Sequence, residues 1–165
     1  MNQLYAEAGV KRKNDIKSSG LRALVVVGII IGVLFILLGG FFSIAGIVLA
    51  VVLVWLYPKL NIEYEYVFVD GQIDFDRITG KSKRKTMLRI DLEQVEIIAP
   101  QGSHALDGYT YVELVKKDFS SNDKNSKPYI IIASVKDKKY RISFEPNEKM
   151  LAMMKQKSPR KISQY

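Results

Sequence analysis

The hydrophobic and polar positions of this chain follow two different patterns, one before and one after residue 58. From Ala23 to Tyr57 no residue is charged, and apolar side chains run on almost without interruption. From Ile62 onward apolar and polar residues alternate, which is typical of β-strands with one buried face. The sequence therefore joins a membrane-type apolar segment to a segment with the polarity of a soluble domain.

The apolar segment is too long for one membrane crossing, because about 20 residues at ~1.5 Å each span the ~30 Å hydrocarbon core. Gly39 and Gly40 lie near its midpoint. Two consecutive glycines let a backbone turn sharply where other residues would resist. The pattern predicts a transmembrane helical hairpin with helices over residues 21–38 and 41–57, turning at the two glycines.

Basic residues flank the apolar segment on both sides, between Lys11 and Arg22 before it and at Lys59 after it. Because positive residues near membrane segments favour the cytoplasmic side, we expect a multi-pass protein of the cell membrane with both termini and the C-terminal domain in the cytoplasm. Two alternatives stay open. One is a signal peptide cleaved near Ser43-Ile44-Ala45, and the other is a single tilted helix that places the C-terminal domain outside.

Small residues recur at a spacing of four in both halves of the apolar segment, as Gly28 with Gly32 and Gly46 with Ala50. This spacing lets helix backbones approach closely. We expect these faces to pack the two helices of the hairpin against each other; the alternative is a homodimer face.

The alternation after residue 58 predicts an α+β fold: a seven-stranded antiparallel barrel capped by a C-terminal helix. Asp70-Gly71 predicts a tight turn between its first two strands, because this dipeptide is a strong hairpin signal. Residues 118–127 are polar and predict a mobile loop. The expected strands cover residues 62–68, 73–77, 85–90, 94–99, 109–116, 128–135 and 139–144, and the helix covers residues 146–155.

These elements predict four regions along the chain. Residues 1–20 form a basic cytoplasmic N-terminal segment with a short apolar edge at Leu4, Tyr5 and Ala8. Residues 21–57 form the hairpin, and residues 59–156 form the barrel. Residues 157–165 are expected to be a basic, flexible tail.

Three stretches carry a resemblance to a known family: Tyr64-Glu65-Tyr66 before Asp70-Gly71, then residues 78–82, then residues 90–96. The chain resembles small bacterial membrane proteins in which a two-helix hairpin precedes a pleckstrin-homology-like (PH-like) domain. The resemblance implies the fold and carries no activity. Some PH-like domains bind inositol phosphates through a basic loop between strands one and two, whereas the tight Asp70-Gly71 turn is expected at that connection here.

Composition excludes several kinds of site. The chain has no cysteine, so a disulfide, a thiolate metal site and a cysteine nucleophile are all excluded. His104 is the only histidine, and neighbouring Ser103 alone does not make a nucleophile motif. We expect no metal, no cofactor and no enzymatic activity.

The most distinctive charged feature is a basic run with no acidic residue between Asp76 and Asp91. Since the first strand starts at the membrane, the second should return toward it, and the connection that follows should face the headgroups. The alternatives are a solvated loop and, less favoured, attraction to nucleic acid. The candidate lipid-binding residues are Arg77, Lys81, Lys83, Arg84 and Lys85.

The sequence thus predicts a membrane-anchored, non-enzymatic interaction module in the cytoplasm, which binds anionic lipid headgroups, a protein partner or both. The alternative is a structural subunit of a larger membrane complex, assembled through the small-residue faces of the hairpin.

Overall fold

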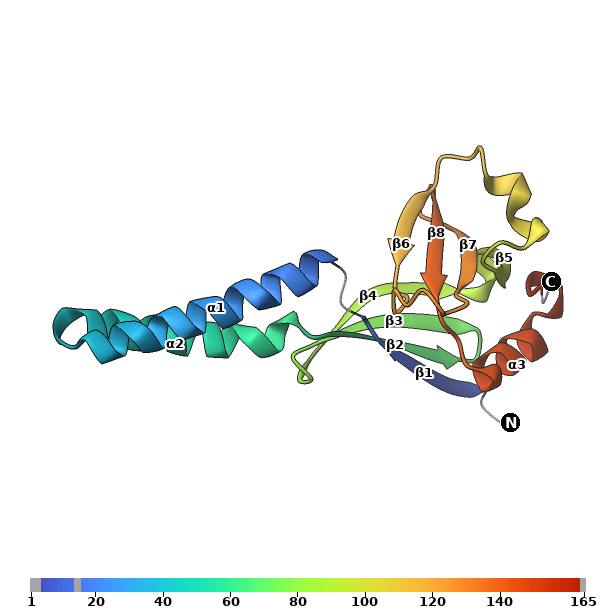
Figure 1. The fold of residues 1–165 in the computed structure, drawn as a ribbon. Coiled ribbons are helices and arrows are strands. Elements are labelled where there is room, and N and C mark those ends of the chain that lie inside the picture. The colour runs from blue at the N-terminus through green and yellow to red at the C-terminus, as the bar shows by residue number, and fades with distance from the viewer. Residues whose placement is uncertain (1–3, 14–15, 164–165) are drawn as a thin grey trace. The chain divides into compact units, whose positions relative to one another are not determined.

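The computed structural model describes residues 4–13 and 16–163 (Figure 1). Its class is α+β, with two apolar helices followed by β-sheets and a C-terminal helix, as predicted. The chain divides into two compact units: one holds both sheets, and the other holds the helix pair together with Thr79–Lys83. The elements are β1 (Tyr5–Lys11), α1 (Ile16–Leu38), α2 (Gly40–Leu56), β2 (Ile62–Val69), β3 (Gln72–Thr79), β4 (Lys83–Asp91), β5 (Val95–Pro100), β6 (Val115–Asp118), β7 (Tyr129–Val135), β8 (Lys138–Phe144) and α3 (Glu148–Lys157).

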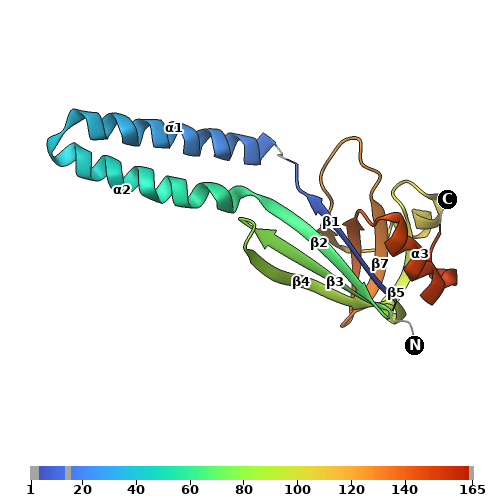
Figure 2. The same ribbon diagram turned by 90° about the horizontal axis from the view of Figure 1, so that it is seen from below.

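The first sheet has the order β1-β2-β3-β4 and contains a strand that the sequence analysis missed. β1 precedes the helices, yet it pairs antiparallel with β2, which follows them, from Tyr5 opposite Val69 to Lys11 opposite Glu63 (Figure 2). Residues 5–11 were expected to belong to a basic N-terminal segment, and no strand was predicted there. The helix pair is therefore an insertion between two neighbouring strands of one sheet.

The second sheet has the order β5-β7-β8-β6, in which β7 pairs antiparallel with β5 and β8. β6 pairs parallel with β8. The prediction of a closed, seven-stranded antiparallel barrel is thus wrong: the described residues form eight strands in two sheets. The strand expected over residues 109–116 is also displaced, because the helical turns of His104–Tyr109 cover the apolar face of this sheet and β6 starts only at Val115.

Aromatic side chains fill the core of the sheet-containing unit. Phe75 is fully buried, stacks on Phe119 at a centroid distance of 5.0 Å, and meets Tyr66 and Phe144 edge to face at 5.7 and 5.8 Å. The Tyr66 hydroxyl donates to the Phe119 carbonyl, and burial raises the pKa of this phenol, so it stays protonated as a donor. Residues 118–127 were predicted to be a mobile loop, but Phe119 anchors their start in the core.

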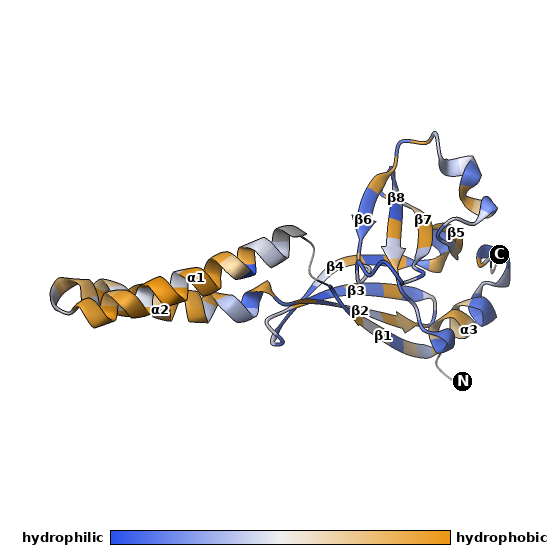
Figure 3. Ribbon diagram, viewed as in Figure 1, coloured by the Kyte–Doolittle hydropathy of each residue, from blue (hydrophilic) through white to orange (hydrophobic). Residues whose placement is uncertain are grey.

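The two helices of the other unit are apolar over most of their length, with hydrophilic residues at their base (Figure 3), and each is long and apolar enough to cross a membrane. Gly39 and Gly40 make the turn between them with φ values of 76° and 58°, which favour glycine. The predicted small-residue faces lie against each other. A Cβ atom added to Gly46 would lie 2.5 Å from the Gly32 carbonyl oxygen, and one added to Gly32 would lie 3.3 Å from the Ala50 Cβ. Gly28 contacts the Leu53 side chain instead, since a Cβ added to it would lie 2.6 Å from Leu53 Cδ1.

Candidate functional site

The connection between β3 and β4 is a tight turn that lies at the base of the helix pair. Gly80 and Lys81 both have φ of 62°, as a two-residue type I′ turn requires. The Gly80 N–H donates to the Asn61 carbonyl at 3.1 Å. A Cβ added to Gly80 would lie 3.5 Å from the Pro58 carbonyl oxygen, so the two backbones are close. These contacts hold the turn beside the end of α2.

The turn brings together three lysines, Lys59, Lys81 and Lys83, which we call the basic foot. Lys81 and Lys83 are exposed, and Lys59 is half-buried with its ammonium group over the ring of Trp55. None of the three forms an ion pair with a carboxylate of residues 4–13 or 16–163. The basic foot therefore presents uncompensated positive charge at the end of an apolar helix pair.

Arg22, near the start of α1, contacts the segment that follows α2. Its guanidinium donates to the Leu60 carbonyl at 3.2 Å and to the Asn61 side-chain oxygen at 2.9 Å. Asn61 thereby links the first helix, the segment after the second helix and the β3–β4 turn. Arg22 therefore stabilises the base of the helix pair, because its guanidinium hydrogen-bonds to residues 60 and 61.

The structure separates the five predicted lipid-binding residues. Lys81 and Lys83 belong to the basic foot, while Lys85 is exposed on β4. Arg77 is half-buried, and its Nε atom is buried without a hydrogen-bond partner in the described part of the chain. Lys59 belongs to the site although it was expected only as a flanking charge. Its position directly after Pro58, in the helical turn that follows α2, was the available signal.

Arg84 serves the stability of the sheet. It forms ion pairs with Glu65 on β2 and, at 3.3 Å, with Asp76 on β3, and the side chains of these acids are only 15% and 8% exposed. A carboxylate at such a position is costly without a cationic partner.

Replacing Arg84 with methionine is therefore expected to lower the free energy of unfolding by about 1–3 kcal/mol, because two poorly hydrated carboxylates lose their partner. Urea unfolding in detergent micelles measures this change. The matched control is Lys85→Met on the neighbouring exposed residue, expected within about 0.5 kcal/mol of the parent protein. Equal effects of the two substitutions on the free energy of unfolding would show that the ion pairs of Arg84 do not stabilise the fold.

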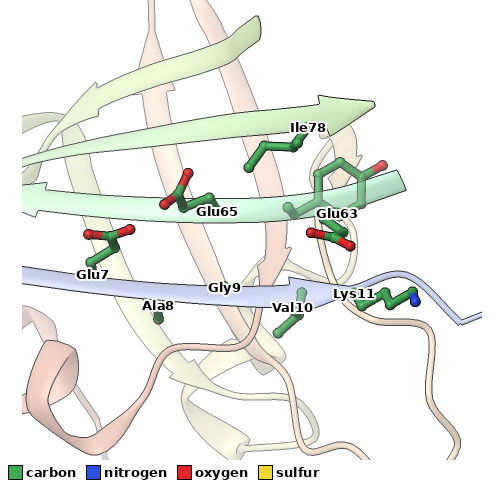
Figure 4. A pocket seen from close by; sticks show the side chains of 9 residues that line it. Glu7, Ala8, Gly9, Val10, Lys11, Glu63, Glu65 and Ile78 are labelled. Atoms are coloured by element: carbon green, nitrogen blue, oxygen red, sulfur yellow. The ribbon is translucent and has the colours of Figure 1, made fainter. Parts of the chain in front are cut away.

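A shallow hollow of about 660 Å³ lies on the face of the first sheet, over β1 and β2 and beside Ile78 of β3 (Figure 4). Gly9 faces Glu65 across the strand pair and contributes no side chain, which leaves the hollow open. Glu7 and Glu63 stand at its sides. No group of His, Asp or Glu among the described residues is arranged to hold a metal ion.

The other residues considered as sites in the sequence have local roles. The His104 ring lies 3.1 Å from an Asp107 carboxylate oxygen in an exposed position. The Ser103 hydroxyl accepts a hydrogen bond from the Ala105 N–H at 3.2 Å, so it caps the helical turn that follows.

Together these features define a class of protein: a two-sheet domain with a C-terminal helix, whose first two strands are separated in the chain by an apolar helical hairpin with a basic foot. The model of the family described as Bacterial PH-like domain (DUF6106) matches residues 2–164. The chain belongs to this bacterial PH-like family, as its resemblance indicates. Searches of curated proteins and of solved structures gave no match.

Proposed function

We propose that this protein is a non-enzymatic PH-like module of the cell membrane, whose hairpin is embedded in the bilayer and whose basic foot binds anionic lipid headgroups on the cytoplasmic side. The hairpin anchors the sheet domain to the membrane, and the lipid contact is made by the residues at the base of the hairpin.

One observation carries the proposal: β1 and β2 flank the hairpin in the chain and are hydrogen-bonded neighbours in one sheet. Lys11, the last residue of β1, lies opposite Glu63 near the start of β2. Two strands paired in this way must lie on the same side of a membrane. This pairing supports helices that enter the membrane and return over a single spanning helix or a cleaved signal peptide.

The orientation follows from charge. Lys11, Arg12 and Lys13 precede the first helix and Lys59 follows the second, so both ends carry the positive residues that favour the cytoplasm. A lysine close to an anionic leaflet contributes about 1 kcal/mol, and the attraction decays within a Debye length of ~8–10 Å. Three lysines at the base of the hairpin are within that range when the helices are in the bilayer.

The alternative is a structural subunit that assembles into a larger complex through the small-residue faces of the hairpin. It has less support, because those faces pack against each other. Gly28, Gly32, Gly46 and Ala50 are used inside the hairpin, where they let α1 and α2 approach. The outer faces of both helices carry large apolar side chains that suit contact with lipid chains.

The lipid contact is tested by lysine acetylation of the protein in nanodiscs of phosphatidylcholine, with and without phosphatidylglycerol. Anionic lipid is expected to slow the modification of Lys81 and Lys83 several-fold, and high salt to remove the protection. The exposed Lys136, in the turn between β7 and β8, and Lys138, the first residue of β8, serve as internal controls and should react equally in both lipids. Equal modification of Lys81 and Lys83 in both lipids would refute the proposed contact.

A further inference from the structure

The outer strand of the second sheet is covered by the segment that follows α3. The order β5-β7-β8-β6 leaves β5 at an edge of this sheet. Ile162 forms a parallel β-bridge with Ile98 on that edge, and the Ser163 N–H donates to the Ile98 carbonyl at 2.8 Å. Residues 158–163, which we call the strap, therefore occupy a place that an added β-strand would take.

Two neighbouring side chains of the strap make the contact specific. Ile162 is only 7% exposed, so its aliphatic side chain is buried in the sheet-containing unit. The Lys161 ammonium group donates to the carbonyls of Leu92 and Glu93, at 2.6 and 3.0 Å. These carbonyls belong to the short helical turn Leu92–Gln94 that precedes β5. The edge thus fits a lysine that is followed directly by a buried aliphatic residue.

The attachment of the strap to the sheet is local. β7 pairs with β5 from Val95 to Pro100, whereas the bridge between the strap and Ile98 is isolated. Within the strap, Pro159 has no N–H to donate, and the Lys161 N–H donates to the Ser158 carbonyl at 3.2 Å instead of to the sheet. Segments attached in this way open at a lower free energy than the whole fold. The strap is therefore expected to leave β5 while both sheets stay folded.

A strap that leaves uncovers the edge of β5 at Ile98 and removes the lysine partner of the Leu92 and Glu93 carbonyls. Open strand edges bind extended segments through backbone hydrogen bonds, and the side chains of the segment give specificity. We propose that the β5 edge is a docking site for an extended segment of a protein partner, in which a lysine precedes isoleucine or valine. The strap closes this site when the partner is absent. The site belongs to the sheet-containing unit and does not depend on the lipid contact of the basic foot.

Opening of the strap is tested by thiol labelling of the full-length protein in detergent micelles. The chain has no cysteine, so Ile162→Cys introduces a single thiol in the strap. Its matched control is Ile142→Cys in β8, at a fully buried position of the same sheet. The thiol at residue 162 should react with dithionitrobenzoate at least about tenfold faster, since its exposure requires only local opening. Urea unfolding of both variants corrects the two rates for any difference in global stability. Equal corrected rates would overturn the proposal.

The docking site is tested by adding a synthetic peptide of residues 158–163 to the Ile162→Cys protein. The tethered strap competes at an effective concentration of about millimolar, so the peptide is used at several times that concentration. It should speed the labelling several-fold, because it occupies the β5 edge whenever the strap is open and so increases the open population. Control peptides carrying Ile162→Asp or Lys161→Met should have little effect. Equal acceleration by all three peptides, or by none, would overturn the docking site.

Discussion

Gly46→Leu is expected to prevent the two helices from packing and to lower the free energy of unfolding by more than about 3 kcal/mol. A Cβ atom at this position would lie 2.5 Å from the Gly32 carbonyl oxygen and 2.9 Å from the Ile36 backbone nitrogen. Both obstacles are backbone, so no side-chain rotation can relieve them. Thermal unfolding in micelles, followed by the fluorescence of Trp55, should show a lower midpoint. Trypsin should also cut faster at Arg22, whose contacts with residues 60–61 require the closed hairpin.

The matched control is Ala45→Leu, one residue away on the exposed side of the same helix. It adds the same side chain facing outward and should leave the midpoint nearly unchanged. Similar midpoints for the two variants would mean that the helices are not held together at Gly46.

Phe75→Ala is expected to lower the free energy of unfolding by about 3–5 kcal/mol. The ring is fully buried and contacts Phe119, Tyr66 and Phe144, so its removal leaves a cavity where segments from both sheets meet. Hydrogen exchange in the membrane-bound protein should show faster exchange in β3 and around Phe119, with the helices unaffected.

The comparison for this substitution is Tyr111→Ala, which removes an aromatic ring that is 98% exposed. It should change stability by no more than about 0.5 kcal/mol. A loss for Phe75→Ala as small as that for Tyr111→Ala would show that the aromatic cluster is not the core.

The parts of the fold that could be predicted are those with local signals. The uncharged residues 23–57 indicated the hairpin, and the pair Gly39-Gly40 indicated its turn. The dipeptide Asp70-Gly71 marked the turn between β2 and β3, where Asp70 and Gly71 have φ of 48° and 110°. Lys136 and Asp137 also have positive φ at the predicted turn between the last two strands.

β1 could not be located in this way because its partner lies far along the chain. Ala6, Ala8 and Gly9 have low β-propensity, and the strand is stabilised by pairing with residues more than 50 positions later. Phe119 was similarly hidden in a polar stretch, since its burial depends on Tyr66 and Phe75. Arg84 could not be separated from its basic neighbours because its carboxylate partners lie on two other strands.

The missed strand also changes the comparison with PH-like domains that bind inositol phosphates between strands one and two. Asp70-Gly71 connects the second and third strands here, and the hairpin itself connects the first and second. The lysines of the basic foot come instead from the β3–β4 turn and from the segment after α2.

The central claim, that β1 and the rest of the sheet domain lie on one side of the membrane, is tested most directly by cysteine labelling. The chain has no cysteine, so Glu7→Cys on β1 and Lys138→Cys on β8 each give a single reactive thiol at an exposed position. In oriented membrane vesicles with a membrane-impermeant maleimide, both thiols should react from the cytoplasmic face and neither from the opposite face. Labelling of the two thiols from opposite faces would contradict the account.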